Sequence, residues 1–280
     1  MGVFNSFINI LKIIYKMDGN DLIRIGSETA KGGFANERAI AEKFNNWEQD
    51  KKAKKWLTIM GYTLKEIEKV EAVILHGYKT DVQIKVTITL KDAISVQNLS
   101  IKKANNNADY NQVDKRWVRN YVEMWSIPEN IVNLLEIFCG KISPKQLLEE
   151  GKITKQKYES LRDKRRFFMD EFENKDKKLL IDFFKKNKLL IITDILKGRE
   201  QFAADWMLVT KYDRRKDETS WVLADINKAM SIFGEGEVRV SPRGSIFIGR
   251  ITLQRKGGDG GRETGDMLQF KIRPCDLFRY

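Results

Sequence analysis

The feature that most constrains the fold is a pair of segments with alternating side chains, residues 80–88 and 94–102. The stretch Leu90-Lys91-Asp92-Ala93 lies between them. Alternation with a period of two is typical of a strand that is buried on one side. We therefore expect an antiparallel hairpin that turns near Lys91 and Asp92.

Side chains on this hairpin could carry chemistry. The expected turn places Asp81 opposite residues 100–102. Ser100 and Lys102 share one strand face and Ile101 points to the other, so Asp81 can share a cleft with both polar residues. A metal ion held by the carboxylate could activate water to hydrolyse a phosphodiester, and the ammonium group could stabilise the developing phosphate charge. The same spacing also arises by chance, so it does not identify a site on its own.

A second carboxylate is expected from a helix upstream of the hairpin. Glu37 shares an otherwise apolar helix face with Phe34, Ile40, Ala41 and Phe44. A buried acid needs a partner, and a metal ion would supply one. The alternative is a different helix rotation that exposes Glu37 to solvent.

Composition restricts the chemistry further. The chain has one histidine, His76, and two cysteines far apart, Cys139 and Cys275. This count argues against a disulfide framework, a Cys/His zinc site, and Ser-His-Asp or Cys-His catalysis. A catalytic metal must therefore be held by oxygen, which favours Mg²⁺, with Mn²⁺ as a substitute. A reducing, cytoplasmic setting fits the same count.

The charge balance points to a polyanionic partner. The formal net charge is +12 and the pI is near 9.5, which suits a protein that neutralises phosphates. The alternative is a soluble protein that is merely basic.

Helix-type and strand-type segments surround the hairpin. A helical pattern spans residues 33–60, and Thr63 with Glu66 resembles a capping box before the apolar run 70–75. We expect an almost wholly helical region over 113–188 and a helix near 223–232. Further strands are expected at 189–193, 206–212, 238–240, 245–254 and 267–272. The expected fold is α/β (α+β), a mixed central sheet flanked by helices, with a helical insertion.

The expected domain organisation is simple. Residues 17–280 form one domain, with a mostly helical subdomain at about 113–188. Residues 1–16 carry apolar side chains at helical spacing but are too few to span a bilayer. We interpret them as an N-terminal extension, either a docking helix or a segment upstream of a start at Met17.

Two loops have the composition of nucleic-acid contacts. The first is amide-rich and supplies Asn107, Tyr110, Asn111, Gln112, Lys115 and Arg116. Amides and cations can read base edges or hold phosphate, and an aromatic can wedge between bases. The second is glycine-rich and supplies Ser241, Arg243, Gln254, Arg255, Lys256, Asp259 and Arg262. The alternatives are a polar surface loop and a flexible hairpin tip. The charge runs 51–55, 164–166 and 214–216 are interpreted as solvated faces.

These residues resemble the HinP-type restriction endonucleases, which cut GCGC sites, belong to the PD-(D/E)XK nuclease superfamily and are related in fold to MspI. The resemblance runs from about residue 17 to the C-terminus. It is carried by the segments 33–37, 78–81, 111–115, 163–166, 193–199 and 254–259.

The resemblance implies a type II restriction endonuclease with a PD-(D/E)XK fold. It implies Mg²⁺-dependent cleavage of double-stranded DNA at a short GC-containing site, GCGC or a related sequence, with 5′ overhangs. Such an enzyme implies a cognate DNA methyltransferase in the same cell and involves no membrane. The oligomeric state, monomer or homodimer, stays open.

The resemblance also assigns residues. The family pattern is Ser-Asp, eighteen residues, then Gln-x-Lys, and here it falls on Thr80-Asp81 and Ser100-Ile101-Lys102. Asp81 and Glu37 are the implied metal ligands and Lys102 is the implied catalytic lysine. Ser100 replaces a longer amide, so the metal would be reached through water or through the Ile101 carbonyl.

The same resemblance makes Tyr110 the aromatic that presses into the duplex. It places Asn111 and Gln112 in the recognition loop and lets the glycine-rich segment hold DNA. The departure at Ser100 leaves two other functions open: a DNA-binding protein with weakened catalysis, and a repair or structure-specific nuclease.

Overall fold

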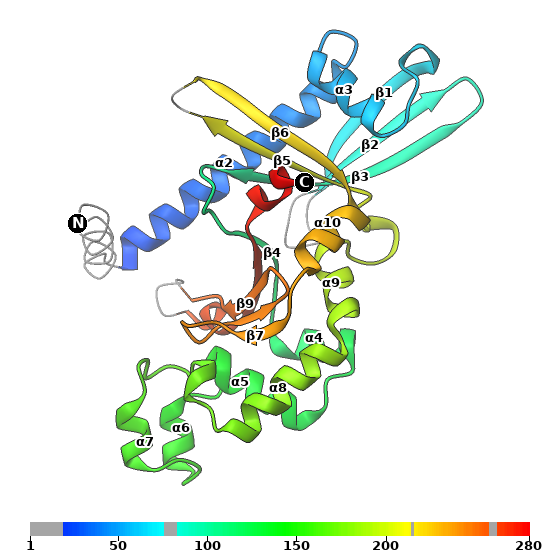
Figure 1. Cartoon of the computed structure of the whole chain (residues 1–280). Coiled ribbons are helices and arrows are strands. Elements are labelled where there is room, and N and C mark those ends of the chain that lie inside the picture. Colours follow the sequence, from blue (N-terminus) through cyan, green and yellow to red (C-terminus); the bar gives the residue numbers. More distant parts are fainter. Residues whose placement is uncertain (1–18, 76–82, 214–215, 258–261) are drawn as a thin grey trace.

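The computed structural model describes residues 19–75, 83–213, 216–257 and 262–280. Figure 1 shows two sheets, with sheet A above sheet B in that view, and several helices below sheet B. Asp81 and Asp259 lie outside the described residues, as does the N-terminal extension 1–16.

Sheet A is built on the hairpin that the sequence predicts. Its strands, in spatial order, are β1 (Ile67–Leu75), β2 (Gln83–Leu90), β3 (Ile94–Ala104), β5 (Trp206–Asp213) and β6 (Glu218–Asp225). β3 and β5 run parallel, and all other neighbours are antiparallel. The Leu90 amide donates to the Ala93 carbonyl at 2.8 Å, which confirms the expected turn.

One face of sheet A packs against α2 (Gly19–Asn45) and α3 (Lys51–Ile59). This layer buries Phe44 and Trp56 against strand residues that include Leu99 and Ile101. The other face packs against α10 (Ile226–Gly234) and the C-terminal 3₁₀ segment η5 (Pro274–Arg279). Ile84, Val86 and Ile88 of β2 are buried in the cluster under α2, and this burial fixes the register of the hairpin, because a slip of one residue would turn them to the other face.

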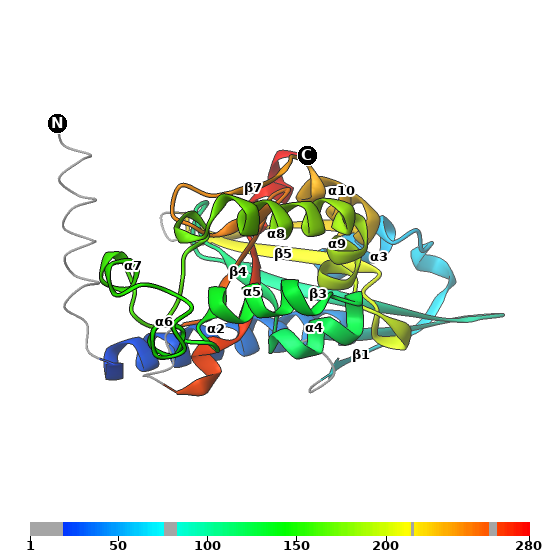
Figure 2. The same ribbon diagram turned by 90° about the horizontal axis from the view of Figure 1, so that it is seen from below.

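Sheet B is antiparallel throughout. Its strands, in spatial order, are β4 (Asn111–Arg116), β10 (Leu268–Ile272), β9 (Ile251–Arg255), β8 (Ile246–Ile248) and β7 (Val238–Val240). One face packs into the same apolar core as α4 (Val118–Trp125), α5 (Glu129–Cys139), α8 (Asn174–Lys186) and α9 (Lys188–Leu196). Figure 2 shows α4 and α5 side by side in front of the strands.

The region between α5 and α8 contains the short helices α6 (Pro144–Glu149) and α7 (Lys155–Ser160) and the 3₁₀ turn η2 (Met169–Glu171). Besides η5, the described residues form the 3₁₀ turns η1 (Leu64–Glu66), η3 (Glu200–Phe202) and η4 (Glu263–Asp266). Among the described residues, none of the helices is both long enough and apolar enough to cross a bilayer.

Several expected elements differ from the structure. Residues 189–193 belong to helix α9, because an uninterrupted apolar run cannot distinguish a buried strand from a buried helix. Residues 113–116 are strand rather than helix, and the expected strand 245–254 is divided by Gly249, which adopts φ 60°. The helix expected near 223 begins at Ile226, after β6.

The capping box was also wrong. Thr63 precedes η1, but its side chain makes no capping hydrogen bond. The strands expected at 206–212, 238–240 and 267–272 are confirmed within a residue at each end.

Candidate active site and nucleic-acid interface

The C-terminal part of β3 presents the expected polar residues. Ser100 and Lys102 are both 4% exposed, and Gln83 of β2 pairs with Ser100. Leu99 and Ile101 belong to the apolar cluster under α2, so Ser100 and Lys102 lie on the opposite face, as predicted. Asp81, two positions before Gln83 in the sequence, lies outside the described residues.

Lys102 links sheet A to sheet B. Its Nζ donates to the backbone carbonyl of Gln112, the second residue of β4, at 3.4 Å. The described pairing of β2 with β3 ends at Ser100, whereas β5 pairs with β3 as far as Ala104.

Glu37 is buried on α2, which confirms that its carboxylate faces inward. It is 8% exposed and lies on the helix face that also buries Ile40, Ala41 and Phe44. Phe34 was expected on the same face, but it is 42% exposed. Because α2 covers the Ile101 face of β3, Glu37 approaches the strand from the side opposite Lys102.

The donor chemistry of this region is oxygen. Glu37 supplies a carboxylate, Ser100 a hydroxyl and Ile101 a backbone carbonyl. Burial raises the pKa of Cys139 to about 12 and also raises the pKa of Cys275, so neither thiol offers a thiolate at neutral pH. Within the described ranges, no three carboxylate, imidazole or thiol side chains gather as a metal centre. The available donors fit Mg²⁺ in type, with Asp81 still to be placed.

The amide-rich loop after β3 is organised by its own side chains. The Asp109 carboxylate accepts hydrogen bonds from the Asn105 and Asn106 amides at 2.7 and 3.2 Å. Asn107 is exposed and accepts from Lys211 Nζ at 3.1 Å. This closed turn holds the start of β4 in place.

Tyr110 follows the loop and is 41% exposed. Arg273 donates to the Tyr110 hydroxyl at 3.1 Å, and its guanidinium lies 5.2 Å from the ring centroid. The aromatic that the sequence singles out is therefore accessible and held by a cation from the segment after β10.

A bulge in β4 divides the remaining loop residues between two faces. The register of β10 with β4 shifts so that Phe270 pairs with Asp114 and Lys271 pairs with Gln112, which leaves Val113 as the extra residue. Phe270 lies in the apolar core, so Asp114 faces the helices and Gln112 faces away from them.

Arg116 lies on the helix side of sheet B. It pairs with Leu268 of the apolar core, and its guanidinium donates to both carboxylate oxygens of Asp114 at 3.1 and 3.2 Å. Asp114 is fully buried and also accepts from the Tyr121 hydroxyl at 2.7 Å. The structure thus places Arg116 in an ion pair behind the sheet, although the sequence suggested a nucleic-acid contact.

The face of sheet B that points away from the helices is polar. Strand alternation places the apolar residues of β9 and β10 toward the helices and the intervening residues on this face. We define the polar face of sheet B as Gln112, Lys115, Thr252, Gln254, Gln269 and Lys271.

Sequence reasoning identified only part of this polar face. It singled out Gln112, Lys115 and Gln254 but missed Thr252, Gln269 and Lys271. The signal for the last two was present: in β10 they alternate with Leu268, Phe270 and Ile272, which are all buried in the core.

The turn 241–245 packs against the helical region. The Ser241 hydroxyl accepts from the amides of Arg243 and Ser245 at 3.2 and 2.9 Å, so it stabilises the turn itself. The Met169 amide of η2 donates to the Gly244 carbonyl at 2.9 Å. Arg243 is exposed at the tip and remains accessible for a contact.

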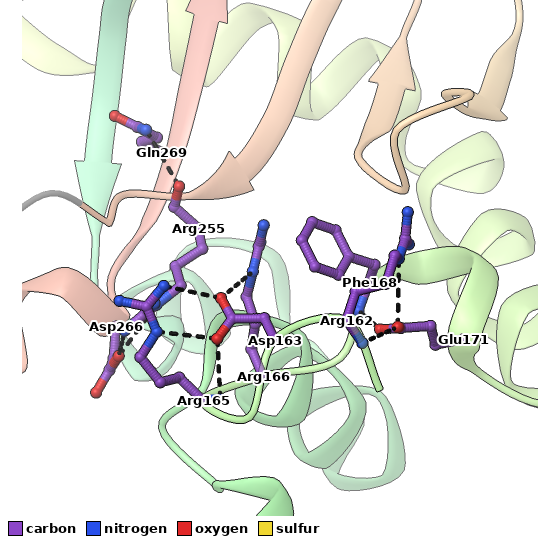
Figure 3. Close-up of polar contacts among 9 residues, drawn as sticks. All are labelled: Arg162, Asp163, Arg165, Arg166, Phe168, Glu171, Arg255, Asp266 and Gln269. Atoms are coloured by element: carbon purple, nitrogen blue, oxygen red, sulfur yellow. Dashed lines mark hydrogen bonds and ion pairs between the residues drawn. The ribbon is translucent and has the colours of Figure 1, made fainter. Parts of the chain in front are cut away.

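The glycine-rich segment is anchored at both ends of its described part. Arg255 forms an ion pair with Asp266, with Nε at 3.2 Å, and Gln269 donates to the carbonyls of Arg255 and Lys256 at 3.2 and 3.1 Å (Figure 3). Lys256 is half-buried and Arg262 is exposed. Arg255 is therefore neutralised within the fold.

The run 164–166 is only partly the solvated face that the sequence suggested, because Lys164 and Arg165 are exposed but Arg166 is not. The Arg166 side chain is 15% exposed, forms an ion pair with Asp163 at 3.8 Å and lies 4.0 Å from the Phe168 ring centroid (Figure 3). Burial lowers the pKa of Arg166 to about 10. Lys164 donates to backbone carbonyls at the end of α7. These cations stabilise the helical region.

Comparison with known proteins agrees with this architecture. The model of the R.HinP1I restriction endonuclease family matches residues 60–278. The crystal structure of the restriction endonuclease MspI in complex with its cognate DNA superposes with a TM-score of 0.54 and 14% sequence identity, over 85% of this chain and 88% of that chain. No curated protein sequence matches significantly. The expected resemblance and the expected fold class are both confirmed.

Proposed function

The chain belongs to the R.HinP1I restriction endonuclease family and is a type II restriction endonuclease, and from this premise we propose its reaction in detail. The proposed reaction is Mg²⁺-dependent hydrolysis of double-stranded DNA within a short GC-containing site, GCGC or a related sequence, leaving 5′ overhangs.

The observation that carries this proposal is the position of Lys102. This lysine is 4% exposed at the edge of β3 and reaches the Gln112 carbonyl on β4. It therefore lies where the expected catalytic strand meets the polar face of sheet B. An ammonium group at this junction can donate to a DNA phosphate oxygen and stabilise the charge that develops during cleavage.

The proposed metal ligands are Asp81 and Glu37, with Ser100 acting through water or the Ile101 carbonyl acting directly. A bound Mg²⁺ would activate water and neutralise phosphate charge. Ser100 is buried beside Lys102, and its short hydroxyl orients a water rather than reaching far itself. The Gln83–Ser100 register, two residues from Asp81, supports this assignment.

The proposed DNA contacts divide by chemistry. Tyr110 is accessible for wedging between bases, and Asp259 is assigned to accept from a cytosine amino group. Amides and cations read base edges or hold phosphates, and the assigned residues are Asn107, Asn111, Gln112, Lys115, Ser241, Arg243, Gln254, Arg255, Lys256 and Arg262. Arg116, which is ion-paired behind the sheet, makes the weakest candidate.

The biological setting follows from the reaction. An enzyme that cuts a short site needs a cognate DNA methyltransferase in the same cell, and we propose a cytoplasmic enzyme that acts as a monomer or homodimer.

A plasmid assay tests the proposal. Purified protein with Mg²⁺ or Mn²⁺ should give discrete DNA fragments, and sequencing their ends should return one short GC-containing site with 5′ extensions. Asp81→Ala and Lys102→Ala should abolish the bands, whereas Lys65→Ala, at an exposed lysine of η1, should leave them unchanged. A smear without consensus ends, or cleavage that persists in both variants, would contradict the proposal.

Ser100 favours one alternative, a sequence-specific DNA-binding protein with weakened catalysis. Such a protein would shift a specific duplex in Ca²⁺ or EDTA yet produce no fragments in Mg²⁺ or Mn²⁺. Ser100→Gln would then be expected to raise cleavage, because it restores the family's longer amide.

A further inference from the structure

Lys271 occupies the centre of the polar face of sheet B. On β10 it pairs with Gln112 of β4 on one side and with Thr252 of β9 on the other. Gln112 is the residue whose carbonyl accepts from Lys102. Lys271 therefore lies one strand away from the contact that joins the two sheets.

None of the described residues compensates the charge of Lys271. Across the described ranges, no carboxylate forms an ion pair with Lys271, and its Nζ makes no hydrogen bond. Its side chain is partly buried, and desolvation lowers the pKa of the ammonium group below its ordinary value. A partly desolvated cation without a counter-ion is unfavourable unless a ligand supplies the negative charge.

Thr252 provides a second, independent indication of a ligand. It is 8% exposed, and its hydroxyl has no hydrogen-bond partner in the described structure. Buried hydroxyls are nearly always hydrogen-bonded, so this group also points to an acceptor or donor supplied from outside the chain.

Neighbouring cations show the contrast. Arg255, on the next strand, is neutralised by Asp266, and Arg116, on β4, is neutralised by Asp114. The charge of each arginine is balanced by a carboxylate of the chain itself, so neither needs a ligand. Lys271 differs from them because it lies on the polar face and has no such partner among the residues that the structure describes.

We propose that Lys271 is a DNA-contact residue, whose ammonium group donates a hydrogen bond to an acceptor of the bound duplex, with the Thr252 hydroxyl as its neighbour. The acceptor is a phosphate oxygen or the O6/N7 edge of a guanine. This inference rests on the proposed function, because it requires that the chain binds double-stranded DNA.

Equilibrium binding of the full chain to a fluorescein-labelled duplex tests the inference. The duplex carries the site found in the plasmid assay, Ca²⁺ replaces Mg²⁺ so that no cleavage occurs, and a second duplex lacks the site. Lys271→Met should weaken binding about tenfold, and Lys271→Arg should restore most of it. Lys65→Met, at an exposed lysine of η1, serves as the control for the loss of one positive charge.

The two acceptors give different patterns. If Lys271 contacts a phosphate, Lys271→Met should weaken binding to both duplexes equally and reduce the slope of log K against log salt by about 0.9. If Lys271 contacts a guanine of the site, Lys271→Met should weaken binding only to the duplex that carries the site. Either pattern supports the inference, whereas binding by Lys271→Met within twofold of wild type on both duplexes overturns it.

Thermal unfolding distinguishes a ligand contact from a structural lysine. Lys271→Met removes an uncompensated charge, so the DNA-free variant should melt at or above the wild-type Tm. A lower Tm for Lys271→Met and Lys271→Gln alike, with DNA affinity unchanged in whichever variant folds, would assign the lysine to structure. If wild-type protein binds neither duplex, the proposed function fails instead.

Discussion

Sheet A and sheet B distribute their polar side chains in different ways. In sheet A, α2 and α3 cover one face, α10 and η5 cover the other face over β3, β5 and β6, and the candidate catalytic residues Ser100 and Lys102 are confined to the C-terminal part of β3. Sheet B has one apolar face and one polar face, with the polar residues spread over β4, β10 and β9. We therefore expect bond hydrolysis and DNA affinity to respond to different substitutions.

The largest effect should come from the covered face of sheet B. Asp114→Ala removes a fully buried carboxylate and leaves the Arg116 guanidinium and the Tyr121 hydroxyl without their acceptor. Breaking a buried ion pair costs about 3–5 kcal/mol, so urea unfolding should show a loss of that size. Asp92→Ala, in the exposed hairpin turn, should change stability little. A normal unfolding midpoint for Asp114→Ala would refute the assignment of this face to folding.

The next largest effect is expected on the cleavage rate, through a residue of sheet A. Lys102→Ala should slow single-turnover cleavage about 10²–10³-fold, which is the usual result of removing one donor to a developing charge. DNA affinity in Ca²⁺ should stay within a few fold of wild type, because the polar face of sheet B is intact. Equal losses in cleavage rate and DNA affinity would contradict the assignment of hydrolysis to sheet A and DNA binding to sheet B.

A smaller effect is expected where sheet B meets the helical region. Gly244 adopts φ +73°, and a Cβ added there would lie 2.6 Å from the Phe168 Cβ. Gly244→Ala should destabilise the protein by about 1–3 kcal/mol through backbone strain and overpacking. Gly151→Ala is the matched control, because Gly151 also has positive φ but has no atom within 4 Å of an added Cβ. Similar losses in both variants would mean that the close packing at Gly244 adds nothing.

The smallest effect concerns the helix that covers sheet A. The Asp50 carboxylate caps α3 by accepting from the Lys52 and Ala53 amides at 2.8 and 2.9 Å, and it pairs with Lys43. Asp50→Ala should cost about 1 kcal/mol of stability and leave cleavage unchanged.

The same carboxylate gives this effect a pH dependence. Burial raises the pKa of Asp50, but hydrogen bonds from Lys43 and the two amides outweigh burial and leave the pKa below its ordinary value. The contribution is therefore complete above the unfolded pKa and is lost as the pH falls through the lower, folded pKa. The stability difference between wild type and Asp50→Ala should shrink in acid, and a difference that grows in acid would contradict this reasoning.

Sequence periodicity was sufficient to predict the β2–β3 hairpin and the inward orientation of Glu37. Both depend on local alternation or helical spacing, which apolar burial enforces directly. Residues 189–193 show where the same reasoning fails, because an apolar run without polar interruptions fits a buried helix as well as a strand.

Long-range pairing explains the other failures. Arg166 looks like part of a solvated run, but Asp163 and Phe168 come together around it only in the folded chain. Arg116 and Lys271 are both cations in strands of sheet B. Asp114 lies two residues before Arg116, but only the sheet register shows that this pair faces the helices and that Lys271 lies on the other face, with no carboxylate partner among the described residues. The local sequence therefore does not show which of these cations has a buried carboxylate partner.

The extra residue at Val113 limits how this enzyme can diversify. Because the bulge sends Gln112 to one face and Asp114 to the other, deleting a residue of β4 other than Val113 would shift one end of the strand by one position and turn its side chains to the opposite face. Point substitutions on the Gln112 side leave that arrangement intact. Evolution or laboratory selection for a new DNA target should therefore proceed by replacing side chains, while changes in the length of β4 should be eliminated by misfolding.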